Sequence, residues 1–504
     1  MSLDQDPTCI GRVKHVLGAT VTVALDADLA GIAPIYRGQV LSVGQIGSLV
    51  RIPQGPVELI ASVVLVGISE LVGAVEPLES LQRDERWLQV QLLGEIDKSL
   101  GKFRRGVGTY PGLDDPVHFA VAEDLRCVFP DNDEKSVRIG VLASAEDLPI
   151  SVDLGKLVTR HAAIVGSTGA GKTSAVASIL QAVVRGGWTG ANIIVIDPHG
   201  EYSSALGDSG SVLSVLGSKS SKLKVPYWAL PALDLPRIFA GAVGGPTLNA
   251  RLLTLVTEAK RKFAAASNWL SIDSAAITCD TPIPFDIEEI WYQLEYENGE
   301  TRDIVGDPKS ASIVDKGNAS ELKPPQFKPY SLGSLAPFKG PSYGMFGMIP
   351  AAIRLGLLNP KLSCFGEPRG TVEGPDPLVE VVSEWLGGDR PISVLDFSGV
   401  PAEAADLAIG VVLDLLFELC QRSDSGGPGL GRPSPLLVVL EEAHRYLGPN
   451  ASVNTRNAAN KIAREGRKYG AGLVLVTQRP SDLPDTALAQ CGTLISLRLT
   501  NSVD

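Results

Sequence analysis

The strongest constraint on the fold is a glycine-rich segment that fits the pattern GxxxxGK[ST] at every fixed position. Its residues are Gly166, Ser167, Thr168, Gly169, Ala170, Gly171, Lys172 and Thr173. The apolar run His161–Val165 precedes the segment, and a run with helical spacing, Gly171–Val184, follows it. This order predicts a P-loop, because loop N–H groups and the helix N-terminus surround phosphates. A chance glycine loop is the alternative, and the flanking strand and helix disfavour it.

In a P-loop, the lysine and the hydroxyl residue have separate roles. Lys172 is expected to reach the β- and γ-phosphates of a nucleotide. The Thr173 hydroxyl is expected to hold Mg²⁺. The segment therefore predicts ATP and Mg²⁺ as the ligands of this chain.

A second apolar run, Leu436–Leu440, ends in Glu441 and Glu442. A buried parallel strand would deliver both carboxylates to the sheet edge where the P-loop lies. One acid can hold the metal, and the other can orient and deprotonate the attacking water. The alternative is a solvated helix N-terminus whose acids are stabilised by the helix dipole.

A third apolar run, Ile193–Ile196, ends in Asp197-Pro198-His199-Gly200-Glu201. Asp197 and Glu201 are therefore candidates for the same edge. A turn that uses Pro198 and Gly200, with Asp197 as a local hydrogen-bond acceptor, explains the pattern equally well.

Positive charge is concentrated between Arg456 and Arg479, where six basic residues accompany one acid, Glu465. Arg464 and Arg467 are candidates to reach the γ-phosphate in a neighbouring subunit. A solvated basic helix face is the alternative. Gln478 ends the run Leu473–Thr477, where its amide can position the γ-phosphate or water, or merely cap a strand.

The pattern along the chain predicts four segments. Short β-forming runs from Ile10 to Val66, such as GSLVRI and VELIASVVLVGI, predict a small β-barrel over residues 1–145, in which FRRGVGTYPG and DPVHFAVAEDL are further strands and turns. Alternating strands and helices over 146–245 and 391–504 predict the two parts of one α/β sheet. Residues 246–390 are helical at first and then rich in Pro, Ser, Lys and Gly, which predicts an insertion.

Composition excludes several classes of protein. The net charge of −12 disfavours a simple DNA-coating protein but permits local basic clusters. No apolar run approaches membrane-spanning length, and Met1–Pro7 lacks the order of a secretory signal, so we expect a cytoplasmic protein. The six cysteines lack CxxC spacing, which predicts reduced thiols. His15, His118 and His161 lack metal-ligand spacing and are assigned no chemistry.

Taken together, the motifs resemble one family, the HerA branch of the FtsK/HerA ATPases. The resemblance rests on IGSLVRIP, RHAAIVGSTGAGKT, IDPHGEY, LDFSGVP, LEEAH and REGRKYGAGLVLVTQRPSDL, in family order along nearly the whole chain. It implies a RecA-like P-loop core with a helical insertion, preceded by a small β-barrel, in a hexameric ring with nucleotide between subunits. It also implies that Glu441 holds the metal, Glu442 acts as base, Gln478 is a sensor and Arg467, rather than Arg464, acts in trans. Relatives usually continue beyond the segment LRLTN, so ring stability or partner docking is expected to differ if the chain ends at Asp504.

Two functions follow from the resemblance. The first is an ATP-driven translocase that feeds double-stranded DNA to a NurA-like nuclease. The second is an ATPase scaffold of an antiviral-defence complex with a sirtuin-like or nuclease effector, as in bacterial relatives with a similar barrel. A transporter or remodelling subunit unrelated to DNA would share only the P-loop and is disfavoured by the more specific motifs.

Overall fold

The structure is a computed structural model that describes residues 8–26, 35–36, 39–40, 45–68, 86–130, 136–142, 145–186, 190–207, 210–217, 221–331, 335–388, 390–423 and 429–500. The chain forms two compact units, Met1–Asp153 and Leu154–Asp504. Among the described residues, no helix is both long and apolar enough to cross a membrane. All six cysteine thiols are free, as their spacing predicts.

The first unit is built on a closed barrel of six strands. Its strands are β1 (Cys9–Leu17), β2 (Thr20–Leu25), β5 (Leu49–Gln54), β6 (Val57–Ile68), β7 (Arg86–Asp97) and β9 (Pro116–Phe119). They are arranged in the order β2-β1-β9-β5-β6-β7, and the antiparallel pairing of β2 with β7 closes the barrel. Alternate side chains, such as Val21, Val23, Leu88 and Val90, fill the interior.

Smaller elements complete this unit. They are β3 (Ile35–Tyr36), β4 (Gln39–Val40), β8 (Lys102–Arg105), α1 (Ala122–Val128), β10 (Ser136–Leu142) and β11 (Ala145–Asp153). The predicted strands and turns of DPVHFAVAEDL are correct for β9 but wrong for α1, because Leu125 turns a helical face into a small apolar cluster with Ala120 and Leu148. Most of the predicted run GQVLSV lies outside the described residues. The boundary expected near Ala145 falls at the start of β11, whereas the two compact units divide between Asp153 and Leu154.

The second unit contains a seven-stranded sheet in the order β14-β19-β13-β20-β21-β12-β22, in which all neighbours are parallel. Its strands are β12 (Ala162–Val165), β13 (Asn192–Asp197), β14 (Ser211–Ser214), β19 (Ile392–Asp396), β20 (Leu436–Leu440), β21 (Ala471–Thr477) and β22 (Thr493–Ser496). The strands β12, β19, β20 and β21 are buried along their whole length, which explains their continuous apolar sequences. This confirms the predicted α/β core.

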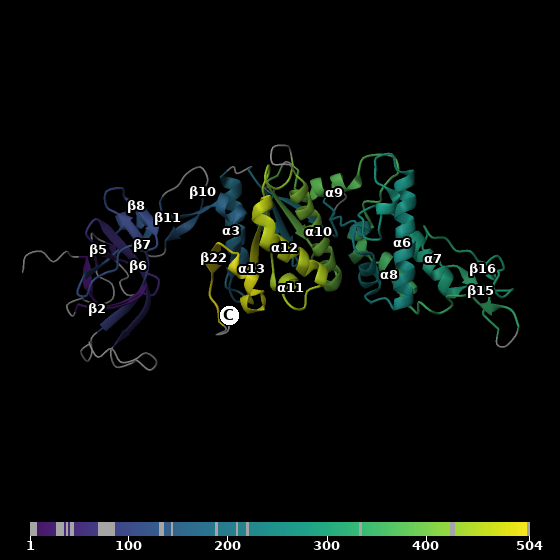
Figure 1. Ribbon diagram of the computed structural model, residues 1–504, viewed down its shortest axis with the longest axis horizontal. Coiled ribbons are helices and arrows are strands. Elements are labelled where there is room, and N and C mark those ends of the chain that lie inside the picture. Colours follow the sequence, from purple (N-terminus) through teal and green to yellow (C-terminus); the bar gives the residue numbers. More distant parts are fainter. Residues whose placement is uncertain are drawn as a thin grey trace, which may run out of the picture. The chain divides into compact units, whose positions relative to one another are not determined.

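Helices flank the sheet in Figure 1. They are α2 (Leu154–Thr159), α3 (Lys172–Arg185), α4 (Ser203–Leu206), α10 (Ala402–Arg422), α11 (His444–Leu447), α12 (Val453–Tyr469) and α13 (Asp485–Ala489). The long helices α10 and α12 pack against each other, and α12 also packs on β21. Figure 1 places α12 and α10 side by side in the middle of this unit.

A helical insertion separates β14 from β19. Its helices are α5 (Leu235–Ala240), α6 (Pro246–Ala266), α7 (Ile287–Gly299), α8 (Ile349–Leu357) and α9 (Pro377–Trp385). Two small hairpins follow α7, formed by β15 (Thr301–Arg302) with β18 (Phe338–Lys339) and by β16 (Ile313–Asp315) with β17 (Gln326–Phe327). Three fully buried tryptophans, Trp228, Trp291 and Trp385, belong to the same apolar core as the sheet.

One buried cation stabilises the insertion. Lys260 of α6 is completely inaccessible to solvent. Its Nζ donates to the carbonyl oxygens of Trp228 at 3.0 Å, Cys279 at 2.7 Å and Thr281 at 2.7 Å. These bonds join α6 to two segments that have no long helix or strand of their own.

We predict that Lys260→Met lowers the free energy of unfolding by about 2–4 kcal/mol, because three buried carbonyls lose their donor. Chemical denaturation measures the change. Lys262→Met is the matched control, since Lys262 lies on the same helix and is exposed, and it should change stability by less than about 0.5 kcal/mol. Equal effects of the two substitutions would contradict the role of Lys260.

The same residue should show a defined pH dependence. Burial lowers the pKa of Lys260 from its ordinary 10.5 to about 8. Between these values the unfolded chain binds more protons at this site than the folded chain, so the contribution of Lys260 to stability increases with pH. The stability difference between wild type and Lys260→Met should therefore grow from about pH 8 to pH 10. A constant difference would contradict this assignment.

Candidate nucleotide site

Parallel pairing places the predicted site residues at one edge of the sheet. The P-loop follows β12, Gln478 follows β21, Glu441 and Glu442 follow β20, and Asp197 ends β13. The strand β21 lies between β12 and β20, so Gln478 stands between the P-loop and the two glutamates. The carboxyl edge of a parallel sheet is the usual location of a ligand site.

The glycines of the P-loop meet two different requirements. Gly169 and Gly171 have backbone φ values of 75° and 94°, which residues other than glycine rarely adopt. At Gly166 a Cβ atom would lie 2.9 Å from the Cβ of Leu497, so the close approach of the following segment requires glycine. In this structure the N–H groups of Gly166, Ser167 and Ala170 donate to the carbonyl oxygens of Thr477, Arg498 and Ser167, at 3.3, 2.9 and 3.1 Å.

The two polar residues at the start of α3 make local contacts. The buried Lys172 donates from Nζ to the Ser167 carbonyl oxygen at 3.3 Å. The Thr173 hydroxyl donates to Oε2 of Glu201 at 2.7 Å. Both side chains are therefore in reach of the loop, and Glu201 lies beside the hydroxyl that is predicted to hold Mg²⁺.

Asp197 organises the turn after β13. It is fully buried, and its carboxylate accepts the N–H groups of His199 at 3.1 Å, Gly200 at 2.9 Å and Tyr202 at 3.0 Å. Burial raises the pKa of Asp197, whereas these three donors lower it. The geometry is that of the local hydrogen-bond acceptor that the sequence allows as one of two interpretations.

Glu441 is almost fully buried, and its Oε2 accepts the hydroxyl of the buried Tyr202 at 2.8 Å. The pKa of Glu441 is raised to about 7, mainly by burial and also by the neighbouring acids Glu442, Glu201 and Asp197, while the hydrogen bond from Tyr202 lowers it. These four acids therefore lie close enough to repel one another. A bound divalent cation would remove that repulsion.

Glu442 has a strained backbone and an unsatisfied side chain. Its φ is 53°, an uncommon value for a glutamate. Its Oε2 is buried and accepts no hydrogen bond from the described residues, although His444 Nδ1 lies 3.2 Å away. That imidazole nitrogen forms its hydrogen bond with Oγ1 of Thr477, at 3.1 Å. Strain and a free carboxylate oxygen are typical of functional positions.

Gln478 joins the P-loop to the end of β21. Its Oε1 accepts a short hydrogen bond from the hydroxyl of Thr168. The segment after β22 also contacts the loop, because the carbonyl of Arg498 accepts from the backbone and the hydroxyl of Ser167, at 2.9 and 2.6 Å.

Arg464 and Arg467 both lie on α12 and are exposed. Within the described part of the chain neither guanidinium forms an ion pair or a hydrogen bond. Their donors are therefore available to a group outside this chain.

Three residues that contact the candidate site were not predicted from the sequence. They are Tyr202, His444 and Thr477. His444 has a sequence signal, because it follows Glu442 by two residues and Glu441 by three. The contacts of Tyr202 and Thr477 depend on the order of strands in the sheet, which local sequence does not encode.

The donor set fits a nucleotide with Mg²⁺. Thr173 and Glu441 offer hydroxyl and carboxylate oxygens, which Mg²⁺ prefers. No group of three metal-ligating side chains occurs among residues that the structure describes.

A family model and several curated proteins that are similar to this chain are described as helicases. Residues 137–322 match the family model described as the central domain of helicase HerA. The DNA double-strand break repair helicase HerA of Pyrococcus furiosus is 24% identical over 458 residues, which cover 84% of this chain and 71% of that protein. A probable helicase of Methanocaldococcus jannaschii is 25% identical, with 87% of this chain and 75% of that protein covered.

Among solved structures, VirB4 of Thermoanaerobacter pseudethanolicus is similar with a TM-score of 0.41 and 14% identity, over 73% of this chain and 86% of that one. The short segment shared with a probable HerA of Methanocaldococcus jannaschii is 45% identical over 74 residues, 14% of each chain. The family model and the relatives aligned along most of the sequence show that this chain is similar to helicase HerA.

Proposed function

We propose that this chain is the subunit of a ring-shaped ATPase, a hexamer, that hydrolyses ATP to move or process double-stranded DNA. The observation that carries the proposal is the sheet edge itself, where Gln478 contacts the P-loop on one side and stands next to Glu441 and Glu442 on the other. The names of similar proteins, DNA double-strand break repair helicases, support DNA as the substrate.

Each side chain has a task in this proposal. Lys172 and the loop N–H groups bind the β- and γ-phosphates, while Thr173 and Glu441 hold Mg²⁺. Glu442 orients the attacking water and accepts its proton on a carboxylate oxygen. Gln478 senses the γ-phosphate through the tip of β21. Mg²⁺, when bound, neutralises charge on the phosphate oxygens.

A neighbouring copy of the chain completes the site. The exposed and unpaired guanidinium groups of Arg464 and Arg467 support this step, because a cation supplied in trans stabilises the charge of the transition state. We favour Arg467 as that cation.

Two further ideas rest on the family resemblance alone. One is a NurA-like nuclease partner, and the other is the alternative role as a scaffold in antiviral defence. Both roles use the same nucleotide site, and movement along DNA separates them. A triplex-displacement assay with duplex DNA should show ATP-dependent translocation by the purified protein. ATP hydrolysis without displacement would favour the scaffold.

We predict that Glu442→Gln reduces ATP turnover by about 10²–10⁴-fold, because the amide cannot accept the proton of water. The protein should still bind ATP, so ATP should co-elute with it in gel filtration. Phosphate release measures turnover. Lys172→Ala is the companion variant, and it should lose both turnover and bound ATP. Normal hydrolysis by Glu442→Gln would assign the base elsewhere.

We predict that an Arg467→Ala subunit inhibits its neighbours in mixed rings. Because each site needs a cation from the next copy, an all-variant ring should lose about 10³-fold in rate. Mixing Arg467→Ala with Lys172→Ala subunits, each inactive alone, should restore turnover at sites that combine an intact P-loop with Arg467 of the adjacent copy. Lys468→Ala, exposed on the same helix, is the control. Mixed rings of the two inactive variants that show no turnover would refute a trans role.

A further inference from the structure

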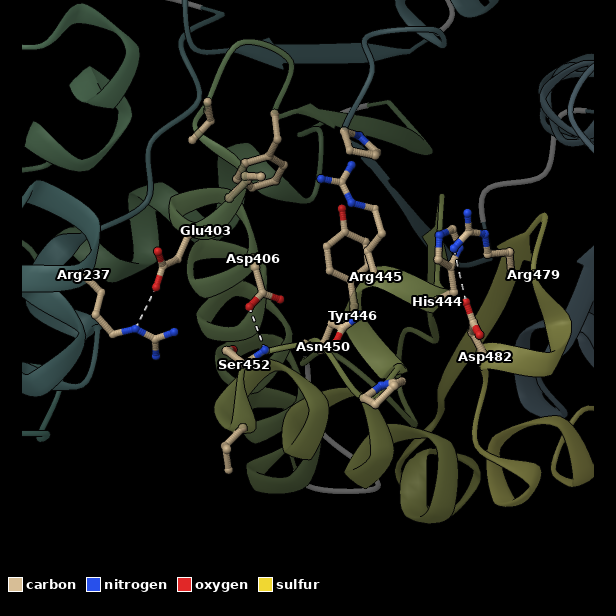
Figure 2. A pocket seen from close by; sticks show the side chains of 18 residues that line it. Arg237, Glu403, Asp406, His444, Arg445, Tyr446, Asn450, Ser452, Arg479 and Asp482 are labelled. Carbon is tan, nitrogen blue, oxygen red and sulfur yellow. Dashed lines mark hydrogen bonds and ion pairs between the residues drawn. The ribbon is translucent and has the colours of Figure 1, made fainter. Parts of the chain in front are cut away.

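A groove of about 760 Å³ opens next to the proposed catalytic glutamate. It is walled by the segments that follow β13, β19, β20 and β21 and by the first turns of α10 and α12. Figure 2 shows Arg445, His444 and Arg479 at the groove, with Arg237 and Glu403 across from His444. Glu442 itself is not part of the lining.

One arginine of the groove is already paired. Arg237 donates to Glu403 at 2.9 Å and to Asp234 at 3.2 Å, so its charge is used within the chain. Asp406 accepts the backbone N–H of Ser452 at 2.9 Å, whereas its Oδ1 is buried without a hydrogen-bond partner among the described residues.

Two arginines retain donors for a ligand. Arg445 is exposed and forms no ion pair or side-chain hydrogen bond with the described residues. Arg479 is also exposed and reaches its one ion-pair partner among them, Asp482, at a long 3.7 Å. Guanidinium groups bind phosphate oxygens through two donors at once, so this side of the groove suits a phosphodiester backbone.

The groove is connected to Glu442 through one imidazole. His444 lines the groove, and its Nδ1 lies 3.2 Å from Oε2 of Glu442 and 3.1 Å from Oγ1 of Thr477. The same Oγ1 accepts the backbone N–H of Arg479 at 3.0 Å. A short path therefore runs from Arg479 through Thr477 and His444 to the carboxylate.

The carboxylate at the end of this path is poorly fixed. Glu442 adopts a φ of 53°, which is uncommon for a glutamate, and its Oε2 accepts no hydrogen bond from the described residues. A small displacement of His444 that aligns Nδ1 with Oε2 would supply that bond. Such a device needs only a ligand that favours one of the two arrangements.

We propose that the groove binds the phosphate backbone of double-stranded DNA through Arg445 and Arg479, and that His444 is a positioning residue that fixes Glu442 when DNA is bound. The inference rests on the proposed function, because it assumes that Glu442 is the base. It adds the surface through which DNA accelerates ATP hydrolysis.

The binding step is tested with Arg445→Glu in the full-length protein. ATP turnover is measured with and without a duplex, and duplex affinity is measured by fluorescence anisotropy over a range of salt. We expect the stimulation of ATP turnover by DNA to fall at least about fivefold. The slope of log affinity against log salt concentration should decrease by about one, the value for one lost phosphate contact. Arg422→Glu, at the opposite end of α10, should behave as wild type.

The outcomes separate the two proposals. Wild-type protein that neither binds DNA nor responds to it would overturn the proposed function. Wild-type protein that responds to DNA, together with an Arg445→Glu variant that responds equally, would overturn only the groove. Polyglutamate serves as a second probe in the same binding assay. If Arg445→Glu loses binding to polyglutamate but keeps its affinity for the duplex, the groove would be assigned to an acidic protein partner and not to nucleic acid.

The positioning step is tested at His444. His444→Ala should lower kcat in the presence of DNA by about tenfold with KM for ATP changed by less than about twofold, since the nucleotide contacts remain. His444→Asn should recover part of kcat, because its amide can occupy the place of Nδ1. A purely packing role predicts that Asn is no better than Ala, and that result would refute the proposal.

Discussion

Parallel pairing of β12, β21, β20 and β13 is the constraint on which the nucleotide site depends. Because the strands run in one direction, the segments that follow them all emerge at one edge. The central position of β21 brings Gln478 between the P-loop and the glutamates and allows Thr477 to meet His444. With another strand order the sequence would contain the same residues, but their side chains would no longer lie together at one site.

The same edge concentrates unfavourable interactions. Glu441 is buried next to other acids, which raises its pKa to about 7, and Glu442 combines a positive φ with an unsatisfied oxygen. The buried strands and the packing of α12 on β21 support this edge. Functional sites commonly contain such destabilising features, and a bound ligand can then stabilise them.

The strands and helices of the core were predictable because their signals are local. The apolar run Leu436–Leu440 coincides with β20, and the run with helical spacing, Gly171–Val184, agrees with α3 to within one residue at each end. No strand is predicted over Arg86–Asp97, because WLQVQLLGEID mixes apolar and polar residues without regular alternation and follows a charged segment. In the structure that strand closes the barrel by pairing with β2.

The identities of most candidate site residues could also be predicted, whereas their mutual contacts could not. Motif spacing identifies Lys172, Thr173 and Glu441. The hydrogen bond between Thr173 and Glu201, and the one between His444 and Thr477, arise only when distant strands meet. Asp197 shows the limit most clearly, since its sequence context fits a ligand and a turn equally well, and only the coordinates reveal three backbone donors.

The most direct test of the central claim is a structure of the assembled protein with a non-hydrolysable ATP analogue and Mg²⁺. The account predicts phosphates within the loop Gly166–Thr173, Mg²⁺ contacted by the Thr173 hydroxyl, and a guanidinium from the adjacent subunit at the γ-phosphate. Nucleotide bound away from this sheet edge, or a site whose cations all come from the chain that holds the phosphates, would contradict it.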